Sequence, residues 1–282
     1  MKVDRHTLRG TPANLLTTLD GAAISDKAAE SRMWYGGAAA GISCISLFFL
    51  WPLGLGAALA LSSGKVNFKV FLGLMAVIVP ALLVFFGVRY YLTASEEDLD
   101  DARLEMLRSL LEHLRHDLPP SKELELTVDF RQTDQAPFLV SGEMALGAFR
   151  QTWLVLQGRF LDGTAFKLQV EQLVKKKTKP KRRGNKIKLK TRERLTLDLK
   201  ASPRVYPPLD GLEQMAGSPP ANLAQTRVQT SGHRVKAMLL TRRAGPGGNL
   251  ASLGISQADT LLSGLVYLYH GMRVLKSKAV PG

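Results

Sequence analysis

Two long runs without a charged side chain set the strongest limit on what this chain can fold into. They cover residues 33–64 and 70–88, which are 32 and 19 residues long, and only the segment KVNFK separates their hydrophobic parts. A helix needs roughly 20 apolar residues to cross a bilayer, and soluble helices of such length usually carry charge on one face. The sequence therefore predicts a transmembrane helical hairpin with spans at about 34–62 and 69–92.

The ends of the two runs are typical of a membrane interface. Each run has an aromatic pair at its outer end, Trp34-Tyr35 in the first and Tyr90-Tyr91 in the second. Such amphipathic rings favour the level of the lipid headgroups. Gly37 and Gly41 form a small-xxx-small pair, so we predict that these two glycines pack the helices together in the membrane.

Charges beside the spans predict an orientation. The connecting loop carries two lysines, while more Lys and Arg residues flank the outer ends of the hairpin. This bias favours cytoplasmic N- and C-termini, and we expect an integral protein of a bacterial cytoplasmic membrane. Residues 1–32 contain no apolar signal segment and are interpreted as a polar N-terminal segment. The single cysteine, Cys44, lies within the first apolar run, which agrees with a reducing compartment for the rest of the chain.

The remainder of the chain predicts a membrane α+β fold. An amphipathic stalk helix is expected over 95–118, starting at a Ser95–Asp98 cap, and a cytoplasmic β-rich domain is expected over 119–276. Alternating apolar residues indicate about six to seven mostly antiparallel strands, including a weak one at 137–141. A C-terminal amphipathic helix over 256–276 and a tail over 277–282 complete the chain. The strand count with its closing helix resembles PH-like barrels, and a sandwich is the alternative arrangement.

One segment of the β domain is extremely basic. Twelve of the twenty residues from 175 to 194 are Lys or Arg, and only one is acidic: the basic residues are Lys175, Lys176, Lys177, Lys179, Lys181, Arg182, Arg183, Lys186, Lys188, Lys190, Arg192 and Arg194. Without this segment the 38 basic and 24 acidic residues of the chain fall to 26 and 23, so the net charge drops from +14 to +3. The basic character is local, which favours a patch that binds a target.

Period-2 alternation predicts that the basic segment is one end of a β-hairpin over 164–200. From position 186 onward, even positions are mostly basic and odd positions mostly apolar. Aligning the apolar faces places Leu168 opposite Leu195 and Phe166 opposite Leu197, with a loop near residues 180–183. Lysines also protect exposed strand edges from aggregation, so part of this charge has a purely structural explanation.

The predicted transmembrane hairpin anchors the β domain beside the bilayer, and this decides which polyanion we expect at the basic hairpin. A domain anchored beside the bilayer holds its charges near anionic headgroups, where each Lys or Arg contributes about 1 kcal/mol. We therefore predict binding to anionic lipid or to an acidic protein partner. Nucleic acid is a less favoured alternative, because single-strand binding usually adds stacking aromatic residues and none occurs between positions 175 and 200.

No sequence motif indicates catalysis. The chain has no Walker loop, no Gly-x-Ser-x-Gly and no cysteine–histidine cluster, and His113 with His116 more simply complements a helix end than binds a metal. We expect no cofactor and no metal. The sequence favours a non-enzymatic, membrane-anchored docking or scaffold protein; the alternatives are a membrane-tethered nucleic-acid-binding protein and an accessory subunit of a membrane enzyme or transporter complex.

Overall fold

The structure is a computed structural model that describes residues 4–62, 68–95, 98–140, 147–181, 184–212, 223–241 and 253–279. The chain forms two compact units. One consists mainly of residues 21–99, and the other combines residues 4–20 with residues from 100 onward. This division differs from the predicted polar segment over 1–32 and the predicted domain start at 119, because residues near the N-terminus belong to the sheet.

The first unit is built from two long apolar helices, α1 (Pro12–Ser62) and α2 (Phe68–Ser95). Both are long and apolar enough to cross a membrane. They approach each other closely at Gly36, where an added Cβ would sit 3.0 Å from the carbonyl oxygen of Gly87, and at Gly54, where an added Cβ would meet the Val77 side chain. The predicted contact residues are displaced from these points: a Cβ at Gly37 would first meet Tyr91 at 3.9 Å, and one at Gly41 would meet nothing within 4 Å.

The helix geometry explains this difference. Positions four apart share a helix face, and the face in contact contains Gly36 and Ala40, whose Cβ would lie 3.3 Å from a Cβ added at Gly87. The pair Gly37 and Gly41 is rotated about 100° from that face.

A hydrogen bond joins the two ends of the helical unit. The backbone N–H of Leu99 donates to the Oδ1 atom of Asp26 at 2.5 Å, and the Asp26 side chain is buried. Ala29 and Ala94, close to these residues in the chain, are also buried. The segment that contains both apolar helices therefore begins and ends at neighbouring points.

The second unit contains one open antiparallel sheet with strand order β1-β2-β3-β4-β5-β7-β6. Its strands are β1 (Arg5–Gly10), β2 (Leu124–Asp129), β3 (Ala148–Arg159), β4 (Ala165–Lys181), β5 (Gly184–Lys200), β6 (Leu223–Ser231) and β7 (Arg234–Thr241). Among the described strands, β1 and β6 are the two edges, so the sheet is neither the predicted barrel nor a sandwich. β1 was not predicted from the sequence.

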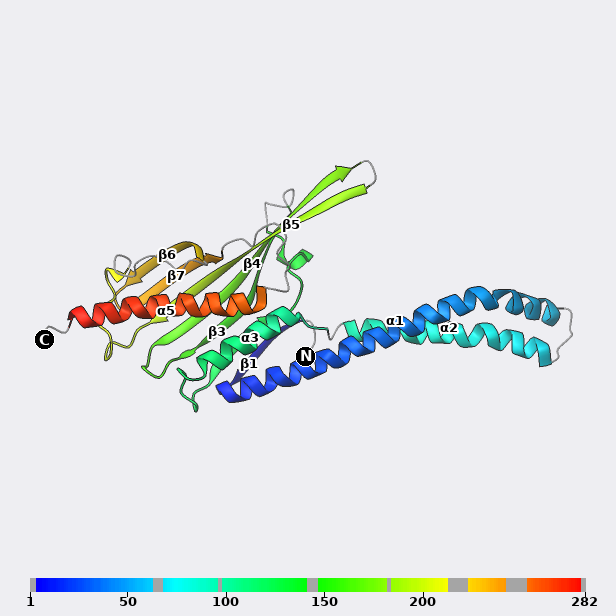
Figure 1. Cartoon of the computed structure of the whole chain (residues 1–282), viewed down its shortest axis with the longest axis horizontal. Coiled ribbons are helices and arrows are strands. Elements are labelled where there is room, and N and C mark those ends of the chain that lie inside the picture. The colour runs from blue at the N-terminus through cyan, green and yellow to red at the C-terminus, as the bar shows by residue number, and fades with distance from the viewer. Residues whose placement is uncertain are drawn as a thin grey trace. The chain divides into compact units, whose positions relative to one another are not determined.

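The described α-helices of this unit cover one face of the sheet and leave the other open. Helices α3 (Asp101–Leu114) and α5 (Leu253–Ala279) lie across the same face and contact each other (Figure 1). The apolar side chains of that face form the core, with Leu126, Leu156, Leu168 and Leu197 completely buried. Side chains alternate across a strand, so the polar residues between these leucines lie on the open face.

Two predicted elements have different limits in the structure. The helix predicted over 95–118 begins at Asp101, because the Asp100 side chain, and not Ser95, accepts hydrogen bonds from the backbone N–H groups of Ala102 and Arg103. Ser95 instead ends α2. The strand predicted at 137–141 is a short 3-10 helix, η1 (Ala136–Phe138), followed by a single bridge between Leu139 and Phe149.

The long β4–β5 hairpin is present, but its register is two residues from the predicted one. Leu168 lies opposite Leu197, and Phe166 lies opposite Leu199. Pairing continues to Lys181 opposite Gly184, so the turn is centred later than predicted. A shift of two residues leaves every side chain on the same face, and the apolar pattern therefore does not distinguish the two registers.

Candidate functional site

The end of the β4–β5 hairpin carries the predicted basic residues. Lys175 to Lys181 lie on β4, and Lys186 to Arg194 lie on β5, while Arg182 and Arg183 are outside the described residues. β3 pairs with β4 only as far as Lys175, and β7 pairs with β5 only as far as Arg194. The hairpin therefore extends beyond the other described strands by about six residues, or about 20 Å (Figure 1).

Lys175 and Lys190 lie directly opposite each other on the open face of this hairpin. Both side chains are exposed, and so is Arg192 one step closer to the sheet, where it faces Leu173. Beyond this point the same register places Lys177 opposite Lys188 and Lys179 opposite Lys186. Like charges directly opposite each other are destabilising in an antiparallel pair, so the pattern is unfavourable for folding alone. We call Lys175, Lys190 and Arg192 the basic face.

Two of the predicted basic residues do not belong to the basic face, because acidic neighbours neutralise them. Arg194 forms an ion pair of 3.3 Å with Glu171, its cross-strand partner. Lys176 lies on the opposite face of β4 and forms an ion pair of 3.4 Å with Asp134.

Farther from the hairpin end, two arginines of the open face form ion pairs with acidic residues. Arg9 pairs with Glu125 at 3.3 Å, and Arg234 donates to both carboxylate oxygens of Asp198 at 2.8 and 2.5 Å. These bonds from Arg234 hold the pKa of Asp198 below its ordinary value, although partial burial opposes the shift. At the hairpin end, by contrast, Lys175 and Lys190 face each other across the two strands.

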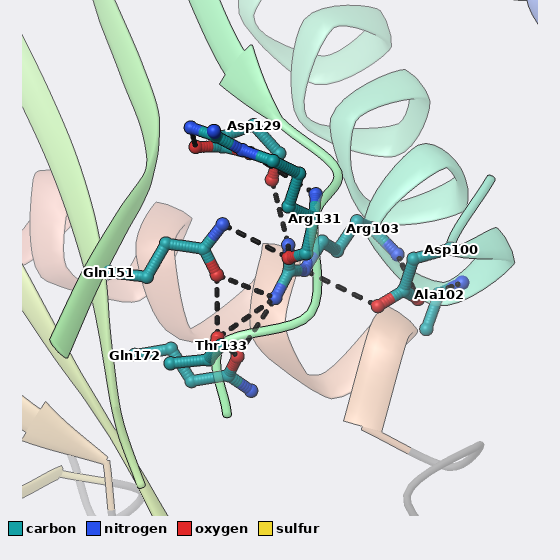
Figure 2. A network of polar contacts seen from close by, with 8 residues as sticks. All are labelled: Asp100, Ala102, Arg103, Asp129, Arg131, Thr133, Gln151 and Gln172. Atoms are coloured by element: carbon teal, nitrogen blue, oxygen red, sulfur yellow. Dashed lines mark hydrogen bonds and ion pairs between the residues drawn. The ribbon is translucent and has the colours of Figure 1, made fainter. Parts of the chain in front are cut away.

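A second polar site, which the sequence analysis missed, surrounds Arg103 on α3 (Figure 2). Its side chain is 7% exposed and donates to the carbonyl oxygens of Asp129 at 2.7 Å and Arg131 at 3.0 Å. It also donates to the Oε1 atom of Gln172 at 2.8 Å and forms an ion pair with Asp100 at 3.3 Å. Arg103 thereby joins α3 to the end of β2 and to β4.

Thr133 and Gln151 complete this network. The Thr133 hydroxyl contacts Arg103 at 3.3 Å and Gln151 Oε1 at 2.6 Å, and it also makes a short contact with Gln172. Burial lowers the pKa of Arg103, while the negative charges of Asp100, Glu193 and Asp129 act in the opposite direction. An arginine remains charged despite such a shift. The N–H groups of Arg103 are bonded to neighbouring residues of the protein, so the network has a structural role. We call Arg103 and the residues that contact it in Figure 2 the clamp.

Asp129 and Arg131 form the outer part of the clamp. The Nε and Nη2 atoms of Arg131 donate to the two carboxylate oxygens of Asp129 at 2.9 and 2.7 Å, and the Arg131 backbone N–H donates at 3.1 Å. Burial raises the pKa of Asp129, but these hydrogen bonds outweigh it, so the pKa lies below the ordinary value. One sequence signal could have revealed the site: Arg103 shares the apolar face of α3 with Leu107, Leu110 and Leu114.

No group of metal-ligating side chains occurs among the described residues. The fold and the two polar sites define a protein with two long apolar helices and a one-sided antiparallel sheet that extends a basic hairpin. In comparisons with known proteins, no family model, no curated protein and no solved structure matches the chain.

Proposed function

We propose that this is a non-enzymatic, membrane-anchored docking protein, whose basic face binds the headgroups of anionic lipids. The single observation that carries the proposal is the acid-free pairing of Lys175 with Lys190 at the end of the hairpin, next to Arg192. A polyanion relieves the repulsion between these like charges, and each Lys or Arg held near an anionic leaflet contributes about 1 kcal/mol.

Membrane insertion is supported by the side chains that α1 and α2 expose. Large apolar residues are mostly uncovered on both helices; for example, Phe48 is 78% and Phe49 is 72% exposed. The core helix of a soluble protein would bury such residues, and covering one large apolar side chain contributes about 1.5–3 kcal/mol. A bilayer supplies that cover along the whole length of both helices.

The pairing of β1 with β2 supports an even number of crossings. β1 precedes both apolar helices and β2 follows both, yet Arg5 pairs with Asp129 and Gly10 pairs with Leu124. Strands pair only when they lie on the same side of a membrane. Two crossings satisfy this condition, and the distribution of Lys and Arg around the spans favours the cytoplasmic side for the sheet.

Labelling of introduced cysteines tests this topology in intact cells. On a Cys44→Ser background, we expect Asn67→Cys to react with an impermeant thiol reagent and Ser202→Cys to react only after lysis. Reaction of Ser202→Cys in intact cells would reverse the orientation. Equal reaction of both sites before lysis would contradict the two-span topology.

Tethering of vesicles tests the docking function. The full-length protein is reconstituted in neutral phosphatidylcholine vesicles and mixed with a second population that is neutral or contains phosphatidylserine. We expect tethering of the acidic population only, and its loss in the triple variant Lys175→Glu, Lys190→Glu, Arg192→Glu. The control variant, Lys122→Glu, Lys200→Glu, Arg204→Glu, changes the net charge equally at exposed positions outside the basic face.

Competition distinguishes the lipid from the other polyanions. RNA or polyglutamate is added at a charge matched to the acidic vesicles, and the bound species is measured. The proposal predicts that the vesicles remain bound. Displacement by RNA would support the nucleic-acid alternative, and displacement by polyglutamate would support an acidic protein partner. Equal tethering by both triple variants would rule out the basic face as the docking surface.

A further inference from the structure

A groove of about 520 Å³ lies on the open face of the sheet, and its lining contains none of the three residues of the basic face. Its floor contains hydroxyl and amide side chains, among them Thr127, Thr152, Gln157 and Gln169, and Arg5, Arg131, Arg150 and Lys167 also line it. The only acidic residues in its lining are Glu125 and Asp129. The volume falls within the range of small-molecule sites.

A β-bulge in β3 brings Arg150 into this groove. The register shifts between Thr152 and Leu154, so that Thr152 pairs with Glu171 while Leu154 pairs with Val170. Without the shift, Arg150 would share a face with the buried Leu154 and Leu156, because side chains alternate along a strand. Bulges often re-aim side chains next to functional sites.

Both acidic side chains of the groove already accept hydrogen bonds from other residues of the protein. Glu125 accepts hydrogen bonds from Gln157 at 2.9 Å and from Arg9 at 3.3 Å. Asp129 accepts a bidentate pair of hydrogen bonds from Arg131. The Arg131 guanidinium also lies 5.1 Å from the centre of the Phe138 ring. In the part of the chain that the structure describes, neither Arg5 nor Arg150 has a carboxylate within ion-pair distance.

Arg5 and Arg150 are close enough to contact a common ligand. Arg5 pairs with Asp129 on β2, which lies beside β3, so Arg5 is two strands away from β3. Two strand spacings of about 4.8 Å and one two-residue step of about 6.8 Å place the two Cα atoms about 12 Å apart. Two extended arginine side chains span that separation with an anion between them. Counting the lining residues, four bases against two acids leave a net charge of +2.

We propose that this groove binds a phosphomonoester, with Arg5 and Arg150 as the residues that contact the phosphate. A phosphomonoester carries a charge of about −1.5 to −2 near neutral pH, which matches the net charge of the lining. Its three terminal oxygens accept hydrogen bonds from guanidinium forks and from hydroxyl or amide donors of the floor. The phosphate belongs either to a small soluble molecule or to a lipid headgroup.

Calorimetric titration of the full-length protein in neutral detergent tests this site, with glycerol 3-phosphate and dihexanoyl phosphatidic acid as probes. We expect saturable 1:1 binding of at least one probe, weakened about tenfold by Arg150→Gln and by Arg5→Gln. Arg150→Lys should lie between these variants and the wild type, because it keeps the charge and loses the fork. The control, Arg159→Gln, removes an exposed charge from the same strand outside the groove and should bind within about twofold of the wild type.

The choice of probe assigns the source of the phosphate. Tighter binding of glycerol 3-phosphate indicates a soluble ligand, and tighter binding of phosphatidic acid indicates a lipid headgroup. Binding of neither probe would overturn the proposal, and so would equal weakening by Arg150→Gln and Arg159→Gln or equally tight binding of acetate. The double variant Lys175→Glu, Lys190→Glu should retain the binding measured here. It leaves Arg192 unchanged, because Arg192 lies in the same cross-strand row as Arg150, with Leu173 between them. Failure of the docking function and failure of this site are therefore distinguishable.

Discussion

The guanidinium of Arg103 lies over the indole ring of Trp153, with its Cζ atom 5.1 Å from the ring centroid. Trp153 is the residue at which β3 bulges, since Thr152 pairs with Glu171 and Leu154 already pairs with Val170. The contact therefore joins the buried clamp, on the helix-covered face of the sheet, to the bulge in β3. The same bulge directs the Arg150 side chain to the open face. Cation–π contacts of this kind strengthen when they are removed from water.

Replacing Arg103 should destabilise the sheet unit strongly. Arg103→Met removes the donors that satisfy the carbonyls of Asp129 and Arg131 and leaves buried acceptors without partners, which we expect to cost about 3 kcal/mol or more. Chemical denaturation in mild detergent measures this loss. The matched control is Arg108→Met on the same helix, whose side chain is half-exposed and should change stability by less than about 1 kcal/mol. Similar losses for both variants would contradict the clamp.

Local sequence patterns predicted the individual helices and strands of this chain better than the order in which the strands pair in the sheet. The alternation around Leu126 and Leu168 predicted β2 and β4, and the charge-free runs predicted two long apolar helices. The sheet position of β1 could not be predicted, because the partner of β1 lies more than a hundred residues later and six residues such as RHTLRG have little apolar pattern. Long-range pairing is decided by the whole sheet and not by the segment.

In the candidate site, too, local features were predictable from the sequence and long-range contacts were not. The basic hairpin was predictable because its charge and alternation are contiguous in sequence. The neutralised residues within it were not, since Lys176 meets Asp134 from a distant loop. The role of Arg103 was not predicted, because the periodicity of the leucines around it is enough to predict the helix without it.

The hairpin register can be tested by cross-strand cysteines. With Cys44→Ser as background, Gln169→Cys with Thr196→Cys joins directly opposite positions, whose Cα atoms should lie about 4.5–5.5 Å apart, within the range of a disulfide. We expect mild oxidation to close this pair. Gln169→Cys with Arg194→Cys is the control, because those positions are diagonal and about 7–8 Å apart. Faster closure of the control pair would indicate the register predicted from the sequence.

The contact between α1 and α2 should depend on Gly36 and not on Gly41. A side chain at Gly36 meets the backbone of Gly87 and Tyr91 at 3.0 Å, whereas one at Gly41 meets nothing within 4 Å. Gly36→Val should therefore cost about 1–3 kcal/mol more than Gly41→Val, since the propensity change is equal in both. Thermal unfolding followed by circular dichroism in mild detergent compares the two. Equal melting temperatures would place the helix contact elsewhere.

Acid should destabilise the sheet unit through Asp129 and Asp198, whose pKa values both lie below the ordinary value. A carboxyl group with a lowered pKa contributes stability that is fully present above its unfolded pKa of about 3.9 and is lost as the pH falls through its folded pKa. We expect a level melting temperature between about pH 6 and pH 5 and a decline below about pH 4. Asp129→Asn should make this decline shallower. An unchanged decline in that variant would assign acid sensitivity to other carboxyl groups.

Because the N–H of Leu99 bonds to the carboxylate of Asp26, the chain returns to the place from which it departed. Everything between these two residues is thus an insertion in an otherwise self-contained sheet domain, and a link of a few residues can bridge the gap. A shortened protein that keeps residues 4–26 and joins them to 99 retains β1 beside β2. One that simply starts after α2 loses β1, which exposes β2 as a new edge and invites aggregation. A form of this protein that lacks the two long apolar helices and keeps the whole sheet is therefore obtained by excision from the middle and not by truncation from the N-terminus.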